Sequence, residues 1–249
     1  MNHPLQPPPP NPPRPWLMSQ TLTDVWFAHW PVTASCLRPE IPSSLEIDTY
    51  GDSAWISVVA FRVCGERFRF LPPMPGISSY LQLNLRTYVT YDGEPGVYFF
   101  SCDVSRWLNA MGARLLFHLP YLPARLQLTP QGDNTLLTCN RSASFAPAAR
   151  FQASMRTVSP SFHAAPGTLA HWLTSRYSQY LAHRGALYRG DIRHKPWPLQ
   201  QAEGFIDENT LPAAIQLPAL AGSPLCHFAT AVTAHIWPFI RLKTGPTQT

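Results

Sequence analysis

The chain has 249 residues, a formal net charge of +5 and only 13% charged residues, and its basic residues are scattered singly. A nucleic-acid reader shows a basic stripe, so we expect no nucleic-acid partner. A hydrophobic fraction of 45% with 12% aromatic residues excludes global disorder, and no apolar run reaches the length that crosses a bilayer, so we expect no membrane partner.

Residues 1–15, MNHPLQPPPPNPPRP, are a proline tract that we expect to be an extended, disordered tail. The tract lacks the apolar core of a signal peptide. The alternative interpretation of the tract is a ligand for an SH3-like partner. The five cysteines are odd in number and form no C-x-x-C pair, so we expect free thiols in a cytoplasmic protein. Residues 16–242 show neither a linker nor a repeat and predict a single domain, followed by a short tail over 243–249.

From Trp16 on, short strand-like runs alternate with turn signals. The turns are expected at 50–53, 92–96 and 131–134. The sequence thus predicts hairpins over 44–63, 81–100 and 125–142, and a further strand over 150–158.

Two segments follow helical spacing instead. Residues 105–121 predict a helix that ends at Pro120, and residues 168–185 predict a helix that begins at Thr168 and ends at Gly185. Several hairpins with two peripheral helices predict an α+β, mainly β fold, an antiparallel barrel or sandwich.

The segment LQLNLRTYVT, residues 81–90, alternates strictly between apolar and polar side chains, which predicts a strand with two unlike faces. Such a polar face either looks at water or lines a polar cavity inside a barrel. An arginine among amide and phenol groups favours the cavity. The polar face consists of Gln82, Asn84, Arg86, Tyr88 and Thr90.

Standard catalytic signatures are missing, including phosphate-binding Gly-rich loops and the nucleophile elbow, so we expect no cofactor. The nine histidines and five cysteines show no metal-ligand spacing, and we expect no metal. The chain's two lysines, Lys195 and Lys243, both lie outside the predicted core strands. A Schiff-base enzyme needs a lysine in an apolar pocket or beside another cation, so this chemistry is not expected.

Five blocks of sequence carry a family resemblance: VWFAHWPV, LEIDTYGDSAWISVVAF, LNLRTYV, GEPGVYFFS and HKPWPLQQA. In this order they resemble the YqjF-like family of uncharacterised bacterial proteins, over nearly all of residues 16–242. The resemblance implies the acetoacetate-decarboxylase-like fold, an antiparallel β-barrel or cone with a central cavity and peripheral helices.

In the decarboxylases of that superfamily, a catalytic lysine follows a Gly-x-Pro turn, and a glutamate before the turn organises the site. The matching turn here places Gly96 where the lysine would stand. Gln82 stands where many family members have glutamate. The resemblance therefore implies the fold without the Schiff-base residues.

The strongest candidate ligand-binding residues are Arg86, whose planar fork binds a carboxylate, and Asn84, whose amide can orient a neighbouring oxygen. Gln82 and Tyr88 share their face, and His29 is a candidate proton carrier. The alternative interpretation is a buried polar network that holds the strands in register, with His29 as a structural residue.

Three further residues have side chains that could contribute to a site. Glu46 and Asp48 lie two residues apart near a turn; such a pair can do acid–base work but is expected here to be solvated. Trp197, between two prolines, could cap a pocket mouth, although packing is the expected role.

The sequence thus predicts a cytoplasmic protein that binds a small organic acid in a barrel cavity. Two interpretations stay open: a lyase-type enzyme without a Schiff-base lysine, and a non-catalytic ligand-binding or structural barrel. A homo-oligomer is compatible with either.

Overall fold

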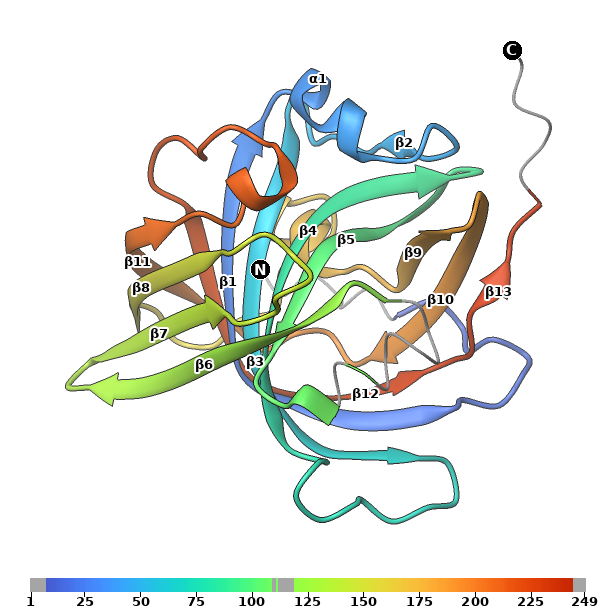
Figure 1. The fold of residues 1–249 in the computed structure, drawn as a ribbon, viewed down its shortest axis with the longest axis horizontal. Coiled ribbons are helices and arrows are strands. Elements are labelled where there is room, and N and C mark those ends of the chain that lie inside the picture. Colours follow the sequence, from blue (N-terminus) through green and yellow to red (C-terminus); the bar gives the residue numbers. More distant parts are fainter. Residues whose placement is uncertain (1–7, 109–110, 112–118, 244–249) are drawn as a thin grey trace.

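The computed structural model describes residues 8–108, 111 and 119–243, and strands make up most of it (Figure 1). The strands are β1 (Met18–Val32), β2 (Glu46–Ile47), β3 (Ala54–Phe68), β4 (Tyr80–Tyr91), β5 (Glu94–Val104), β6 (Tyr121–Gln131), β7 (Asn134–Arg141), β8 (Arg150–Thr157), β9 (Ser178–His183), β10 (Ala186–His194), β11 (Leu199–Asn209), β12 (Leu225–Ile236) and β13 (Ile240–Arg241). The helices are α1 (Ala34–Leu37), α3 (Leu169–Thr174) and the 3-10 helices η1 (Arg38–Glu40) and η2 (Ala213–Ile215).

Nine strands close a barrel in the order β5, β6, β7, β8, β11, β12, β1, β3, β4 and back to β5. Most neighbours are antiparallel, but β5 pairs in parallel with β6 and with β9. The expected antiparallel barrel is therefore corrected to a mixed one. A parallel pair needs a connection of a dozen or more residues, and β6 begins at Tyr121, well beyond the end of β5 at Val104.

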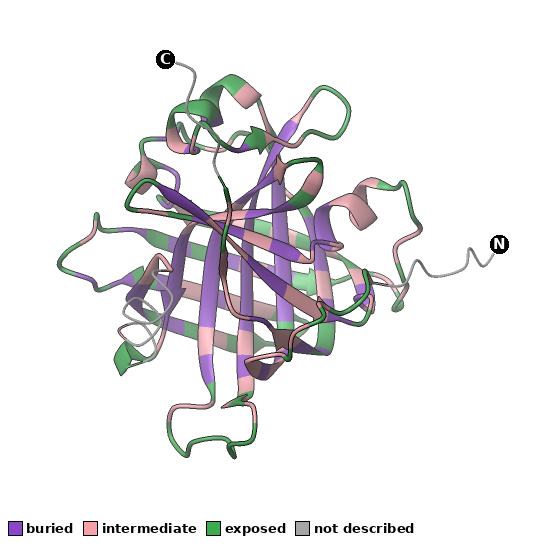
Figure 2. Ribbon diagram, turned by 90° about the vertical axis from the view of Figure 1, so that its right-hand side faces the viewer, coloured by how far each residue is buried: buried purple, intermediate pink, exposed green. Residues whose placement is uncertain are grey.

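A second ring of paired strands shares five strands with the barrel. β9 pairs with β5, and β10 pairs with both β9 and β12. Figure 1 shows β6, β7, β8 and β11 on one side of β1, β3 and β4, with β9 and β10 on the other. The shared strands β12, β1, β3, β4 and β5 consequently have protein on both faces, and Figure 2 shows buried residues running along the central strands.

The two faces of β4 meet different surroundings. Leu83 and Leu85 belong to the large apolar core, together with Phe151 and Met155 of β8. Removal of such side chains from water contributes about 25 cal/mol per Å² of apolar surface and drives the closure on this side. The polar side chains of β4 point the other way, so the predicted two-faced strand is confirmed.

Two of the predicted hairpins are confirmed. β4 and β5 are joined through Asp92 and Gly93, whose φ angles of 51° and 73° fit a two-residue turn of type I′. β6 and β7 likewise pair across Gly132. The turn predicted at 50–53 is present and is closed by a bridge between Tyr50 and Ser53. The strand pairing predicted over 44–63 is wrong, because both edges of β3 are occupied by β1 and β4, and β2 pairs with β4 instead.

The helix predicted over 168–185 is correct only at its start. Thr168 caps α3, with its Oγ1 accepting a hydrogen bond of 3.3 Å from the His171 backbone N–H. The second half is β9, because pairing with β5 and β10 overrides the helical spacing. Arg184 and Gly185 make the β9–β10 turn, with φ angles of 50° and 73°.

The helix predicted over 105–121 falls on residues 109–110 and 112–118, outside the described part, for most of its length. The peripheral helices that are described, α1 and α3, have only four and six residues. No helix in the described ranges is long and apolar enough to span a bilayer.

A fully buried ion pair joins β7 to β5. Arg141 donates to the two oxygens of Asp103 at 2.7 and 2.9 Å, and its Nη2 also donates to Ser101 Oγ at 3.0 Å. The side chains are 2% and 0% exposed. Two hydrogen bonds join the guanidinium fork to the carboxylate, so each charge compensates the other.

We expect Arg141→Met to destabilise the fold by about 3–5 kcal/mol, because Asp103 would remain buried without a partner. The matched control is Arg156→Met, whose partner Glu203 is 61% exposed, and this variant should melt close to wild type. Equilibrium urea unfolding of both variants checks the difference. Equal losses in the two variants would contradict a structural role for the buried pair.

Candidate functional site

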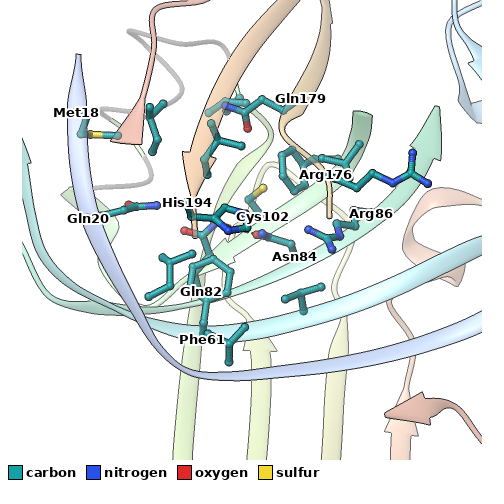
Figure 3. A pocket seen from close by; sticks show the side chains of 18 of the residues that line it. Met18, Gln20, Phe61, Gln82, Asn84, Arg86, Cys102, Arg176, Gln179 and His194 are labelled. Atoms are coloured by element: carbon teal, nitrogen blue, oxygen red, sulfur yellow. Dashed lines mark hydrogen bonds between the residues drawn. The ribbon is translucent and has the colours of Figure 1, made fainter. Parts of the chain in front are cut away.

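A cavity of about 120 Å³ lies between the five shared strands and the β9–β10 hairpin (Figure 3). A single buried water requires roughly 10–15 Å³ by the same measure, so the cavity is large enough to admit a small organic molecule. Apolar side chains such as Phe27, Phe61 and Trp197 form much of its wall. The polar and thiol side chains that line it are Gln20, Gln82, Asn84, Arg86, Cys102, Tyr121, Thr174, Arg176, Gln179 and His194.

The alternation of β4 aims Gln82, Asn84 and Arg86 into this cavity (Figure 3). Tyr121 donates its hydroxyl to Gln82 Oε1 at 3.3 Å, and Gln82 Nε2 donates to Asn84 Oδ1 at 2.7 Å. Gln82 and Asn84 are only 5% and 4% exposed. The polar face of β4 therefore lines a cavity and does not look at bulk water.

Arg86 is half-buried and, unlike the buried Arg141 and Arg176, has no carboxylate partner among the described residues. Its Nη2 donates to the Leu173 carbonyl at a long 3.4 Å, and its Nε is buried without any partner. The guanidinium carbon lies 5.8 Å from the ring centre of Tyr88. The cavity thus contains a cation whose charge the described protein groups leave uncompensated.

Arg176 follows α3 in the chain and lines the same cavity as Arg86. Its Nε donates to the Trp172 carbonyl at 2.7 Å and its Nη1 to Asp48 at 2.5 Å, while Nη2 is buried without a partner. Burial lowers the pKa of Arg176, and Asp48 opposes this shift. Asp48, which we expected to be solvated, is instead 18% exposed and paired, because Arg176 requires a counter-charge.

Tyr88 and His29 lie beside the cavity but do not line it. Ser57 Oγ connects them, at 2.7 Å from Tyr88 Oη and 2.6 Å from His29 Nδ1. Burial, with His227 and Arg86 as smaller causes, lowers the pKa of His29, so its ring is neutral. A ligand-binding role for these two residues stays a prediction; their hydrogen bonds link β1, β3 and β4.

His194, at the end of β10, is a cavity residue that the sequence analysis did not identify. Its Nδ1 lies 2.8 Å from the Lys195 carbonyl, which can only accept, so Nδ1 carries the proton. Burial lowers the pKa of His194 to about 4, and the ring is therefore neutral at pH 7.

Cys102 also lines the cavity, from β5. Burial, and then the nearby Asp103 carboxylate, raise the pKa of its thiol. Because the thiolate is the reactive form, this cysteine is a poor nucleophile in this setting.

Neither lysine of the chain lies in the cavity. Both Lys195 and Lys243 are exposed, and Lys195 lines an outer groove instead. A Cβ at Gly96 would lie 2.6 Å from the Tyr180 ring and 2.7 Å from the Ser178 carbonyl. No side chain fits at the position that the family resemblance assigns to the catalytic lysine.

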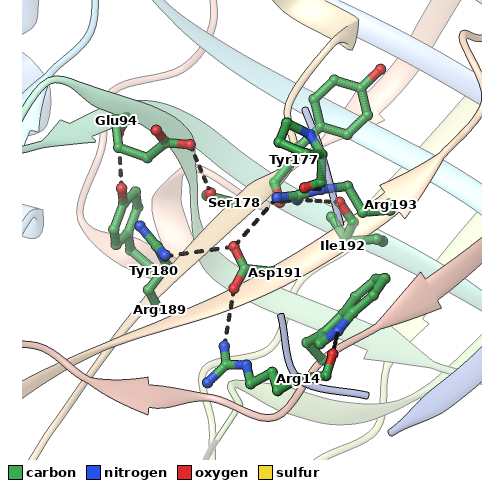
Figure 4. Close-up of polar contacts among 11 residues, drawn as sticks. Arg14, Glu94, Tyr177, Ser178, Tyr180, Arg189, Asp191, Ile192 and Arg193 are labelled. Atoms are coloured by element: carbon green, nitrogen blue, oxygen red, sulfur yellow. Dashed lines mark hydrogen bonds and ion pairs between the residues drawn. The ribbon is translucent and has the colours of Figure 1, made fainter. Parts of the chain in front are cut away.

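Three arginines surround Asp191 of β10, the residue before the cavity residue Ile192 (Figure 4). The Asp191 carboxylate lies 3.0 Å from Arg14, 3.6 Å from Arg189 and 3.8 Å from Arg193. Trp237, which lines the cavity, donates its indole N–H to the Arg14 carbonyl at 2.6 Å. The end of the proline tract thus contacts the barrel, while the predicted division into tails and one domain stays a prediction.

Sequence reasoning missed Arg176 and Gln179 because the segment was interpreted as a helix. Gly185 was the available signal, since glycine readily adopts the positive φ that a two-residue hairpin turn requires, whereas Arg184 gives no such signal. No local signal places His194 or Cys102 in the cavity, because their inward direction follows from pairings between distant strands.

No group of three or more side chains suited to metal binding occurs in the described part of the chain. The expectations of no metal and no cofactor stay predictions.

Comparison with known proteins gives both a family and a fold. The model of the DUF2071 family, described as an uncharacterized conserved protein, matches residues 19–233. The uncharacterized protein YqjF of Bacillus subtilis (strain 168) is 44% identical over 223 residues, covering 90% of this chain and 91% of the relative.

Solved structures that are similar share little sequence. An acetoacetate decarboxylase-like enzyme from Sphingomonas wittichii RW1 matches with a TM-score of 0.63 and 14% identity, covering 93% of this chain and 95% of the other. The enduracididine biosynthesis enzyme MppR in complex with pyruvate matches with a TM-score of 0.61 and 13% identity, covering 96% and 92%. At such identities the likeness shows the acetoacetate-decarboxylase-like fold alone.

The lowered pKa of His194 predicts a loss of stability in mild acid. Between pH 6.5 and about 4 the unfolded chain binds a proton at this residue that the folded state does not, so stability falls as the pH drops through that window. Urea unfolding from pH 7 to 4.5 measures the slope, and His194→Phe should reduce it by close to one proton. An unchanged slope in the variant would contradict a neutral, buried His194.

Proposed function

The chain belongs to the DUF2071 family of uncharacterized conserved proteins, and on this premise we propose that it binds a small carboxylic acid in its cavity. Arg86 holds the carboxylate of the acid, and Asn84 orients a neighbouring oxygen. Gln82 supports Asn84 through the hydrogen bond between their side chains.

The uncompensated charge of Arg86 is the observation that carries this proposal. An unpaired charge in a protein interior costs several kcal/mol, so folded proteins pair it or leave it for a ligand. Arg141 is paired bidentately with Asp103, whereas Arg86 has a buried Nε without a partner. An entering carboxylate would form charge-assisted hydrogen bonds with this free edge.

The size and walls of the cavity support a small ligand. A volume of about 120 Å³ with aromatic walls and a few convergent polar groups is typical of a site for a small molecule. One fold neighbour is known in complex with pyruvate, a small carboxylate. Because that likeness concerns the fold alone, it supports the ligand class by analogy only.

If the protein turns over its ligand, the chemistry is of lyase type with general acid–base help and without a Schiff base. Both lysines lie outside the cavity, and the Cys102 thiol is protonated. The alternative is a non-catalytic binding or structural barrel. The continuous Tyr121–Gln82–Asn84 chain favours it, because such networks also hold strands in register.

The test is thermal-shift titration of Arg86→Met and wild-type protein with propionate, at constant ionic strength maintained with chloride. A ligand that binds only the folded state raises the apparent Tm as its concentration passes Kd. We expect propionate to raise the Tm of wild type and to leave that of Arg86→Met unchanged.

Without ligand, we expect Arg86→Met to melt at or above the wild-type temperature, because an uncompensated cation has been removed. The control Arg62→Met removes a half-exposed arginine of β3 and should keep the response to propionate. An unliganded Arg86→Met protein that melts far lower, with no response of wild type to any small acid, would favour the structural barrel.

A further inference from the structure

We propose that the acid bound in the cavity is a hydroxy acid, whose hydroxyl accepts a hydrogen bond from Asn84 Nδ2 and donates one to His194 Nε2. This inference rests on the proposed function and specifies the class of ligand. It follows from which donors and acceptors the cavity leaves open.

Asn84 leaves a donor open. Its Oδ1 already accepts from Gln82 Nε2 at 2.7 Å, and Gln82 Oε1 in turn accepts from the Tyr121 hydroxyl at 3.3 Å. This series of hydrogen bonds orients the Asn84 amide, so that Nδ2 is the donor that remains open to a ligand. No described residue accepts from Nδ2, although Asn84 is only 4% exposed and lines the cavity.

His194 leaves an acceptor open. Its Nδ1–H donates to the Lys195 carbonyl at 2.8 Å, and burial keeps the ring neutral, so Nε2 has a lone pair and no proton. The side chain is on β10, across the cavity from β4, and it lines the same cavity as Gln82 and Asn84 (Figure 3). Packing against Trp197 and Tyr177, at 4.7 and 5.1 Å between ring centres, holds the imidazole in place.

Three kinds of ligand group can be compared as partners of Asn84 Nδ2 and His194 Nε2. A hydroxyl satisfies both, because it donates and accepts; an oxo group accepts from Asn84 but leaves Nε2 unpaired; a methylene satisfies neither. A buried site that hydrogen-bonds a hydroxyl rejects analogues without one, since its own polar groups are then left unpaired. With the carboxylate on Arg86, the complementary ligand carries its hydroxyl close to the carboxyl end.

Isothermal titration calorimetry with three acids of equal carbon number tests the inference: lactate as each enantiomer, pyruvate and propionate. In wild type we expect one lactate enantiomer to bind roughly tenfold more tightly than pyruvate or propionate. In His194→Phe, which keeps an aromatic ring but has no acceptor, we expect the three affinities to converge within about threefold, with that of propionate unchanged.

A measurement on the unaltered protein does not depend on the variant's folding. The ¹⁵N chemical shift of His194 Nε2 should move on addition of lactate and stay in place with propionate, because only the hydroxyl donates to it. Equal affinities in wild type, or a preference for pyruvate, would overturn the hydroxy-acid inference and leave the carboxylate site intact. Failure of all three acids to bind would overturn the proposed function itself.

Discussion

Burial of β4 on both of its faces is the constraint on which the site depends. Alternation along a strand sends successive side chains to opposite sides, and in this fold neither side is bulk water. The apolar side chains complete the large core with β7 and β8, and the polar ones enclose a cavity with β9 and β10. A strand that would otherwise have one solvent-exposed face thus supplies a row of polar groups to the cavity, in which Tyr121 orients Gln82 and Gln82 orients Asn84.

Two buried arginines and the half-buried Arg86 differ in how far protein groups compensate their charges. Arg141 is satisfied by Asp103, and Arg176 is held by Asp48 and the Trp172 carbonyl. Arg86 has a long hydrogen bond to the Leu173 carbonyl, at 3.4 Å, and its guanidinium carbon lies 5.8 Å from the ring centre of Tyr88. The same residue type therefore ties the structure together where a carboxylate is supplied, and is the basis of the proposed carboxylate site where none is.

The sequence was sufficient for the parts of this account that depend on local pattern. The alternation over 81–90 predicted the strand and placed Gln82, Asn84 and Arg86 on one face, and the Asp92-Gly93 turn predicted the hairpin that follows. What depends on distant pairing was not predictable in this way. The parallel contacts of β5, the strand β9 in a helix-like segment, and His194 across the cavity all arise from long-range contacts that override local spacing.

The most direct test of the central claim is a crystal structure of the protein soaked in propionate. The account predicts a carboxylate in the cavity, with an oxygen at roughly 2.7–2.9 Å from Arg86 Nε. The finding that would contradict it is an Arg86 guanidinium hydrogen-bonded throughout to protein groups, beside a cavity that holds only water. In that case the polar face of β4 would be a structural network, and the cavity would need another explanation.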